Sequence, residues 1–140
     1  MPFELFEHKA DIGIRGIGKT PEEAFEQGAI ALFQIMTETK TVKASEESGI
    51  DVEANDLETL FVEFLNELLF LSDSKKMFYS KFRLKISKRE NSWHLHGKAW
   101  GEKINAKKHK IKTEAKAASY SQLRVGLDKG KWIAQCIVDV

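Results

Sequence analysis

The stretch DLETLFVEFLNELLFLSDSKKMFYSKFRLKI, residues 56–86, contains the change of pattern that decides the fold class. Its first part carries leucine and phenylalanine at helical spacing out to about Ser72, which predicts an apolar core helix. From Phe78 onward, apolar and basic residues alternate at the two-residue period of a half-buried strand, as in Phe82-Arg83-Leu84. Helices followed by a run of strands favour an α+β domain over a doubly wound α/β domain.

Residues before this stretch predict a second helix and further strands. Residues 3–8 and 11–18 are typical of two short strands. A helix then begins after Thr20, because Thr20 is a good N-cap, Pro21 suits the first helical position and Glu23 completes a capping box.

The segment that leads into the core helix is polar and has no periodicity. We predict a loop over residues 37–48 and a short strand over residues 50–54. Asn55 and Glu58 then form a second capping box, which predicts the start of the core helix.

Residues after this stretch predict strands alone. A turn at residues 89–92 separates the strand around Phe82 from a strand over residues 93–100. We predict one longer strand over residues 115–127 and a final strand over residues 132–140. The predicted fold is therefore α+β: a single compact domain over residues 1–140, with an antiparallel β-sheet meander and two main α-helices.

The charges are sorted by sequence half, although the 22 basic and 21 acidic residues give a formal net charge of only +1. Residues 1–74 carry 5 basic and 16 acidic residues, a net −11, whereas residues 75–140 carry 17 basic and 5 acidic residues, a net +12. Such an asymmetry indicates a protein that binds partners. The basic excess peaks in the lysine-rich segment 101–116, for which contact with RNA phosphates and plain solvation both remain open.

Several classes of protein are excluded or disfavoured. The apolar runs fall far short of the roughly 18–20 residues that a membrane span needs, so we expect no membrane association. The start MPFELFEHKAD has neither a basic region nor an apolar core, which argues against a secretory signal and favours a cytoplasmic protein. Cys136 is the only cysteine, so an internal disulfide and a thiolate-rich metal site are excluded.

A phosphate-binding loop is one interpretation of the segment GIRGIGKT, residues 13–20, which matches the pattern G-x-x-x-x-G-K-[ST]. It would make the protein a nucleotide hydrolase, with Asp139 at the end of a strand holding magnesium. The preceding segment is too charged for a buried parallel strand, and no βαβ unit follows. We therefore favour a strand followed by an ordinary helix cap.

Two histidines and two aspartates are candidate metal ligands. His94 and His96 share one face of a strand, but two imidazoles do not make a site, so a solvated strand face is the favoured interpretation. Asp11 and Asp139 each lie among apolar neighbours, where an unpaired carboxylate is costly. If their strands were neighbours, both aspartates and the carboxylate of Val140 could converge on calcium or magnesium, although two surface aspartates are the plainer interpretation.

The whole chain resembles the archease family. The resemblance rests on EHKADIGIRGIGKTPEEAFEQGAIALFQIMT, residues 7–37, and DLETLFVEFLNELLFLSD, residues 56–73. It continues through a GE pair with a histidine-containing basic loop, TEAKAASYSQLRV at residues 113–125, and IVDV at residues 137–140. This sequence differs from the family pattern at Lys9, where threonine is usual, and at Asn105, where aspartate is frequent.

The resemblance implies a non-catalytic activator of the RtcB-type RNA ligase in tRNA splicing and RNA repair. Such a protein would promote guanylylation of the ligase and permit multiple turnover. The resemblance assigns Asp11, Asp139 and the carboxylate of Val140 to a calcium or magnesium site, and Lys116 to activation of the ligase. His8 and His109 are secondary candidates.

Two further points of function stay open at this stage. The basic second half could contact tRNA or its phosphates. The alternative function is that of a chaperone-like modulator of a tRNA-modifying enzyme, such as a tRNA methyltransferase, which would act independently of metal and of Asp139.

Overall fold

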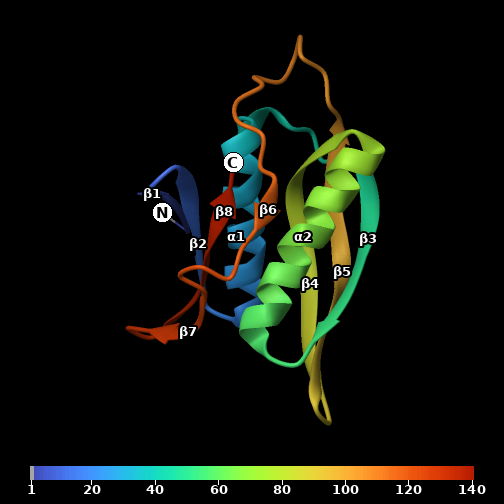
Figure 1. Ribbon diagram of the computed structural model, residues 1–140. Helices are drawn as coiled ribbons and strands as arrows, with labels where there is room; N and C mark the ends of the chain where they lie inside the picture. The colour runs from blue at the N-terminus through green and yellow to red at the C-terminus, as the bar shows by residue number, and fades with distance from the viewer. Residues whose placement is uncertain (1) are drawn as a thin grey trace.

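Strands β2 (Asp11–Gly18) and β8 (Lys131–Asp139) pair antiparallel at the centre of a five-stranded sheet. The structure is a computed structural model that describes residues 2–140. Strand β1 (Phe3–His8) pairs with the free edge of β2, and the short strands β6 (Ala117–Ala118) and β7 (Arg124–Asp128) pair with the other edge of β8. Segments from the two ends of the chain thus lie side by side (Figure 1).

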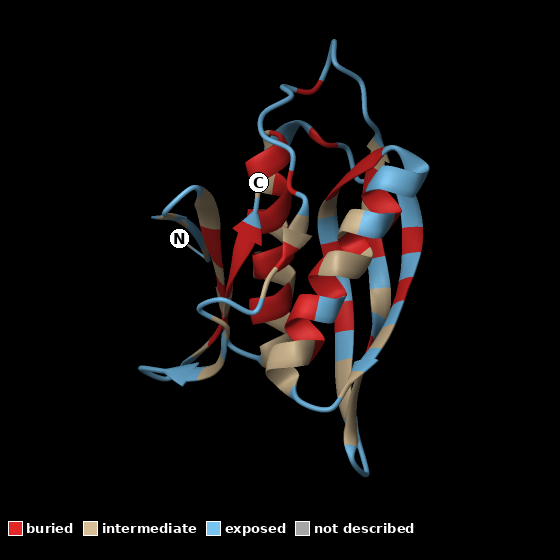
Figure 2. Ribbon diagram, in the orientation of Figure 1, coloured by how far each residue is buried: buried red, intermediate tan, exposed pale blue. Residues whose placement is uncertain are grey.

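A second sheet contains three antiparallel strands in the order β3-β5-β4. They are β3 (Glu46–Ala54), β4 (Met77–Arg89) and β5 (Ser92–Lys103). The expected alternation is confirmed, because Phe82 and Leu84 are buried while Arg83 and Lys85 are exposed. Figure 2 shows alternating buried and exposed bands along the strands of this sheet. All three strands extend beyond the predicted bounds, and β4 contains a register shift between Tyr79 and Lys81.

The two helices, α1 (Pro21–Met36) and α2 (Leu57–Lys75), lie between the sheets (Figure 1). Helix α1 packs on β2 and β8 and also on β4, whereas α2 packs mainly on the three-stranded sheet and contacts β6 and β7. Their buried faces meet through aromatic contacts such as Phe25 with Phe61, whose ring centroids are 5.0 Å apart. The single core therefore lies around the helices, as the apolar stripes predict.

One side chain caps the N-terminus of each helix. Thr20 Oγ1 accepts a hydrogen bond from the backbone N–H of Glu23 at 3.1 Å, as predicted for α1. The predicted cap of α2 is wrong by one residue. Asp56, not Asn55, is the N-cap, since its carboxylate accepts from the N–H of Thr59 at 2.7 Å and this bond lowers the pKa of Asp56.

A close approach explains the glycines at the start of the chain. A Cβ atom on Gly16 would lie 2.0 Å from the carbonyl oxygen of Ala24 and 2.3 Å from the nitrogen of Gly28, so β2 contacts the α1 backbone directly. The segment 13–20 is mostly strand, paired on both sides by β1 and β8. The phosphate-loop interpretation is therefore wrong, and the strand followed by a helix cap is confirmed.

The α+β class is confirmed, with two helices and eight antiparallel strands in the described residues. The strands of the second half divide between the two sheets, and the lysine-rich segment crosses from β5 to β6. The single strand predicted over residues 115–127 is wrong. It is broken into β6 and β7 by a turn in which Gln122 has φ 54° and the Ser119 hydroxyl accepts from the N–H of Ser121.

The loop predicted over residues 37–48 also differs in part. It contains the short 3-10 turn η1 (Thr39–Thr41), and strand β3 begins within it at Glu46.

Candidate functional site

One end of the five-stranded sheet brings Asp11 and Asp139 together. The β2–β8 register ends at the pair Ile12 and Val138, and Asp11 and Asp139 are the next residues along these two neighbouring strands. Asp11 Oδ1 accepts a long hydrogen bond, 3.4 Å, from the backbone N–H of Val140. Asp139 is exposed and Asp11 is half-buried. The condition for the predicted carboxylate site, that the two strands are neighbours, is thus met.

The same row continues onto the outer strands. His8 pairs with Asp11 across the β1–β2 hairpin, and Ala117 of β6 pairs with Asp139. Cross-strand partners in an antiparallel sheet share a face, so His8 lies on the face that carries both aspartates. Lys9 forms the adjoining turn, with φ 55°. Four strands therefore end in one row that is rich in carboxylate.

Lys116 immediately precedes this row. Its backbone N–H donates to the carbonyl oxygen of Asp139 at 2.8 Å, and its side chain is exposed. The next strand, β6, is held by Asn66 of α2, whose side-chain oxygen accepts from the N–H of Ala118 at 2.8 Å and whose amide donates to the Ala118 carbonyl at 3.3 Å. Sequence reasoning missed Asn66. The available signal was an amide in the middle of the most apolar helix.

A groove of about 760 Å³ opens beside Lys116, between α2 and the loop that crosses to β6. Phe70 and Ile111 line it, and their side chains are 65% and 55% exposed. Lys76 and Lys112 lie at the same groove together with Asp73. Exposed large apolar side chains gathered at one groove are a common mark of a protein contact surface.

His109, a secondary candidate, anchors the lysine-rich loop. Its side chain is buried, its Nδ1 accepts from the N–H of Asn105 at 3.0 Å, and its Nε2 lies 2.9 Å from Glu102. Both ring nitrogens are therefore engaged, so His109 offers none to a metal. Glu102 also accepts from Lys108 and from the N–H of Lys43, and the bonds from Lys108 and Lys43 hold its pKa at about 2.

His94 and His96 do lie on one face of β5, with ring centroids 5.6 Å apart. His94 Nε2 is 2.5 Å from a carboxylate oxygen of Asp51 on β3. His96 is exposed. The interpretation of a solvated strand face therefore holds for His96 alone, because the His94 side chain is only 13% exposed and its Nδ1 is buried without a hydrogen-bond partner among residues 2–140.

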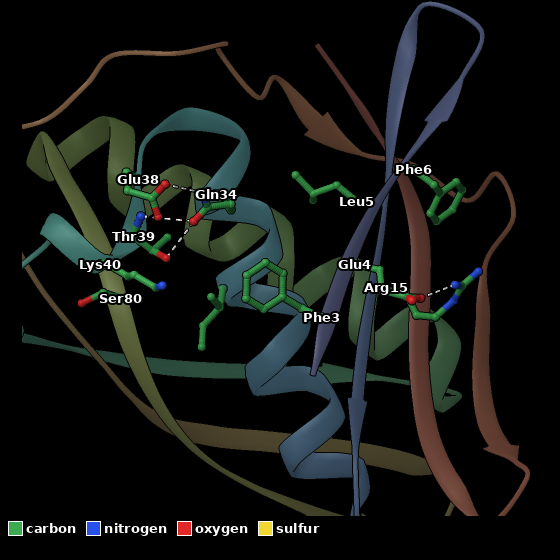
Figure 3. A pocket seen from close by; sticks show the side chains of 11 residues that line it. Phe3, Glu4, Leu5, Phe6, Arg15, Gln34, Glu38, Thr39, Lys40 and Ser80 are labelled. Carbon is green, nitrogen blue, oxygen red and sulfur yellow. Dashed lines mark hydrogen bonds and ion pairs between the residues drawn. The ribbon is translucent and has the colours of Figure 1, made fainter. Parts of the chain in front are cut away.

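Two other features of the fold lie apart from the carboxylate row. A cavity of about 930 Å³ lies between β1 and α1, where Phe3 and Leu5 point toward the helix (Figure 3). Its polar side chains are largely engaged with one another, because Gln34 accepts from Thr39 and donates to Glu38. None of the predicted site residues lines it.

The single cysteine is the other feature. Cys136 is buried, and burial raises the pKa of its thiol to about 12. The thiol therefore stays protonated, and thiolate chemistry at neutral pH is disfavoured.

The donor set at the carboxylate row suits a hard cation. Asp11 and Asp139 offer oxygen atoms, which calcium and magnesium prefer. Within residues 2–140, no group of three or more His, Cys, Asp or Glu side chains is close enough to share an ion. Two side chains therefore have to be completed by main-chain oxygens, the Val140 carboxylate or water.

No helix within residues 2–140 is long and apolar enough to cross a membrane.

These features define a small α+β protein in which two antiparallel sheets enclose two helices and a carboxylate row ends the larger sheet. The sequence model of the Archease protein family matches residues 3–140. The chain belongs to this family.

Relatives named as archeases match this chain over nearly their full length. The chain is 42% identical to protein archease of Pyrococcus furiosus over 139 residues, which covers 99% of this chain and 98% of the relative. It is 43% identical to protein archease of Saccharolobus islandicus over 138 residues, with the same coverage.

Two solved structures share the fold. Protein 1598 of Methanobacterium thermoautotrophicum superimposes with a TM-score of 0.87 at 35% identity, covering 99% of both chains. An archease of Thermotoga maritima, described as a possible chaperone, superimposes with a TM-score of 0.60 at 21% identity, covering 98% of this chain and 96% of that one. The second comparison concerns the fold alone.

Proposed function

We propose that this protein is a non-catalytic accessory protein of an RtcB-type RNA ligase, acting in the cytoplasm in tRNA splicing and RNA repair. The observation that carries the proposal is the meeting of Asp11, Lys116 and Asp139 at one end of β8. The family resemblance assigns Asp11 and Asp139 to a metal site and Lys116 to activation of the ligase. They come from three distant segments of the chain, and the fold gathers them at a partly exposed edge.

The carboxylates of Asp11 and Asp139 would hold a calcium or magnesium ion together with the carboxylate of Val140. This set is all oxygen, as such an ion requires. When bound, the ion supplies positive charge that offsets negative charge on a phosphate during nucleotidyl transfer. The hydrogen bond from the Val140 N–H to Asp11 helps to orient this carboxylate.

Lys116 would contact the ligase or a phosphate that the ligase holds. Its side chain is exposed, while its backbone is fixed by Asp139 and its neighbouring strand by Asn66. A lysine on a fixed backbone loses less freedom on binding than one on a mobile loop. The adjoining groove with Phe70 and Ile111 gives the ligase an apolar surface to cover.

The test is a multiple-turnover RNA ligation assay with the cognate ligase. Asp11→Asn, Asp139→Asn and Lys116→Gln keep the size of each side chain and should each reduce stimulation at least tenfold. Asp128→Asn and Lys129→Gln, in the distant β7–β8 turn, are matched controls and should stimulate normally. Full stimulation by all three site variants would contradict the proposal.

Metal binding is tested separately by calorimetry with calcium and with magnesium. The unaltered protein should bind one ion, and Asp139→Asn should not. Stimulation that persists in excess EDTA and in Asp139→Asn would favour the second candidate function, a chaperone-like modulator of a tRNA-modifying enzyme. The exposed Phe70 and Ile111 would suit that candidate as well as the ligase, because either enzyme could cover them.

A further inference from the structure

The outer face of the three-stranded sheet is a second charged surface, separate from the carboxylate row. The helices cover the inner face, so every second side chain of β3, β4 and β5 points away from them. The pairing places Lys98 beside Arg83, and His96 beside Lys85. Arg83, Lys85, His96 and Lys98 are all exposed.

Acidic side chains on this face lie on β3, and two of them are already occupied. Glu47 pairs with Lys98 at 3.4 Å, and Asp51 contacts His94. On β4, neither Arg83 nor Lys85 forms an ion pair within residues 2–140. The sorting of charge along the sequence therefore becomes a gradient across one sheet, from acidic β3 to basic β4.

Carboxylates from α1 lie at the β4 edge and bind its backbone. Glu26 accepts from the N–H of Leu84 at 3.0 Å, and Glu22 accepts from the N–H of Ile86 at 3.3 Å. Both are thus committed to the edge of the strand, which they protect from pairing with another chain. Burial raises the pKa of Glu26, whereas the hydrogen bond from the Leu84 N–H and, less strongly, the charge of Arg83 lower it.

A groove of about 510 Å³ lies over the basic part of the face. Its lining contains four side chains that are cationic or can become so, one indole and no carboxylate: Arg83, Leu84, Lys85, His96, Gly97, Lys98 and Trp100. Trp100 is half-buried, and the Lys81 ammonium lies 5.2 Å from its ring centroid. The groove therefore combines a flat aromatic surface with a cluster of positive charge.

We propose that the outer face of β4 and β5 binds single-stranded RNA, with phosphates at Arg83 and Lys85, a phosphate at Lys98 in place of Glu47, and a base against Trp100 in place of the Lys81 ammonium. Alternate residues of a strand are about 6.8 Å apart, so Arg83 and Lys85 present charge at a spacing that successive phosphates of an extended strand can match. Cationic grooves with aromatic platforms are the usual means of binding single strands. An acidic peptide would use the charges but not the indole.

This inference does not depend on the proposed ligase function, and it is tested without the ligase. Binding of a fluorescein-labelled 12-nucleotide single-stranded RNA is followed by anisotropy at several salt concentrations. The triple variant Arg83→Gln/Lys85→Gln/Lys98→Gln should bind at least tenfold more weakly than the unaltered protein. The slope of log K against log salt should fall by about 2, since each phosphate contact to a single strand contributes about 0.7.

A matched control removes the same charge elsewhere. Lys19→Gln/Lys40→Gln/Lys129→Gln changes three exposed lysines outside both the groove and the lysine-rich segment, and should weaken binding less than twofold. Equal losses in the two triple variants would show attraction by net charge alone and overturn the site. Circular dichroism and thermal melts of both variants confirm that the loss is not due to unfolding.

Three further measurements distinguish single-stranded RNA from an acidic protein ligand and from an RNA duplex. Trp100→Leu should weaken single-strand binding several-fold, because stacking of a base on an aromatic ring is lost. Polyglutamate of the same charge should compete poorly, and the corresponding RNA duplex should bind more weakly. Competition by polyglutamate as strong as that by RNA would indicate an acidic protein ligand and contradict the proposal. Equal affinity for the duplex, or no effect of Trp100→Leu, would contradict the stacking of a base.

Discussion

Asp11 and Val140, 129 positions apart in the chain, are joined by a hydrogen bond from the Val140 backbone N–H to the Asp11 carboxylate. The bond links the start of β2 to the end of β8, where Asp11 and Asp139 are the next residues after the last pair of the register. Two carboxylates in adjacent cross-strand positions repel each other. An arrangement that costs stability in the free protein and offers oxygen ligands is what a cation site requires.

This repulsion predicts opposite effects of Asp11→Asn with and without metal. In EDTA the variant should be more stable by about 0.5 kcal/mol, since one of two opposed charges is removed while the amide oxygen still accepts from Val140. Calcium should raise the melting temperature of the unaltered protein and leave that of Asp11→Asn unchanged, because only the unaltered protein binds the ion. Differential scanning fluorimetry measures both effects. A calcium-induced rise in the variant equal to that of the parent would argue against the site.

Asn66 is predicted to act through β6 and Lys116. Asn66→Ala leaves the N–H and carbonyl of Ala118 without their side-chain partner, which should cost about 1–3 kcal/mol of unfolding free energy in urea denaturation. Amide exchange in residues 116–119 should accelerate. Asn55→Ala, at an exposed position before α2, is the control and should change the free energy of unfolding by less than about 0.5 kcal/mol. Unchanged exchange near Lys116 in Asn66→Ala would contradict this role.

Gly16 is predicted to be intolerant of any side chain. In Gly16→Ala the new methyl meets the backbone of Ala24 and Gly28, which cannot rotate away, so β2 must separate from α1. Overpacking of this kind typically costs about 1–3 kcal/mol, measurable as a lower urea midpoint. Gly49→Ala is the matched control, because a Cβ on Gly49 meets no atom within 4 Å. Equal midpoints for the two variants would refute the close approach.

Glu102 is predicted to make the lysine-rich loop sensitive to acid. Its pKa is lowered from 4.5 to about 2. A depressed carboxyl pKa gives stability that is fully present above the ordinary value and is lost as pH falls toward the folded-state value. Hydrogen exchange of residues 104–112 should therefore be constant above about pH 5 after correction for the intrinsic rate, and protection should fall from there toward pH 2.

A substitution at Glu102 isolates this effect. Glu102→Gln should lose protection in the loop already at pH 7, because the contacts to Lys108 and His109 lose their charge. Its protection should also vary less between pH 5 and pH 2. Glu63→Gln, on the exposed face of α2, should behave as the unaltered protein. A pH profile of Glu102→Gln that matches the parent would assign the acid sensitivity to another group.

Local patterns in the sequence were sufficient for the secondary structure that depends on near neighbours. The cap at Thr20 and the alternation from Phe82 to Ile86 are confirmed, because each depends on residues within one or two turns or pleats. The predictions failed at points that the local pattern does not mark. The strand expected over residues 115–127 is interrupted after β6 by a turn at residues 119–122, and β6 itself is held by Asn66, 52 positions away.

The sequence alone also singled out Asp11, Lys116 and Asp139, partly from carboxylates among apolar residues and decisively from resemblance to a family. It could not place them together, because strand pairing across the whole chain has no local signature. His109 shows the same limit in reverse. It is a polar residue in a basic loop, yet the fold buries it and uses both of its nitrogens.

The sorting of charge into an acidic and a basic half is a property of the sequence, whereas its meaning depends on the tertiary structure. Pairing of β3 with β5 sets acidic residues against Lys98 and His94 and leaves Arg83 and Lys85 on β4 without ion pairs among residues 2–140. Pairing of β2 with β8 sets the acidic Asp11 beside Asp139, which belongs to the basic half. The periodicity of apolar residues depends on near neighbours in the chain, so the sequence alone predicts the helices, the strands and the class of fold. The two surfaces arise from contacts between residues far apart in the chain, and only the folded structure decides them.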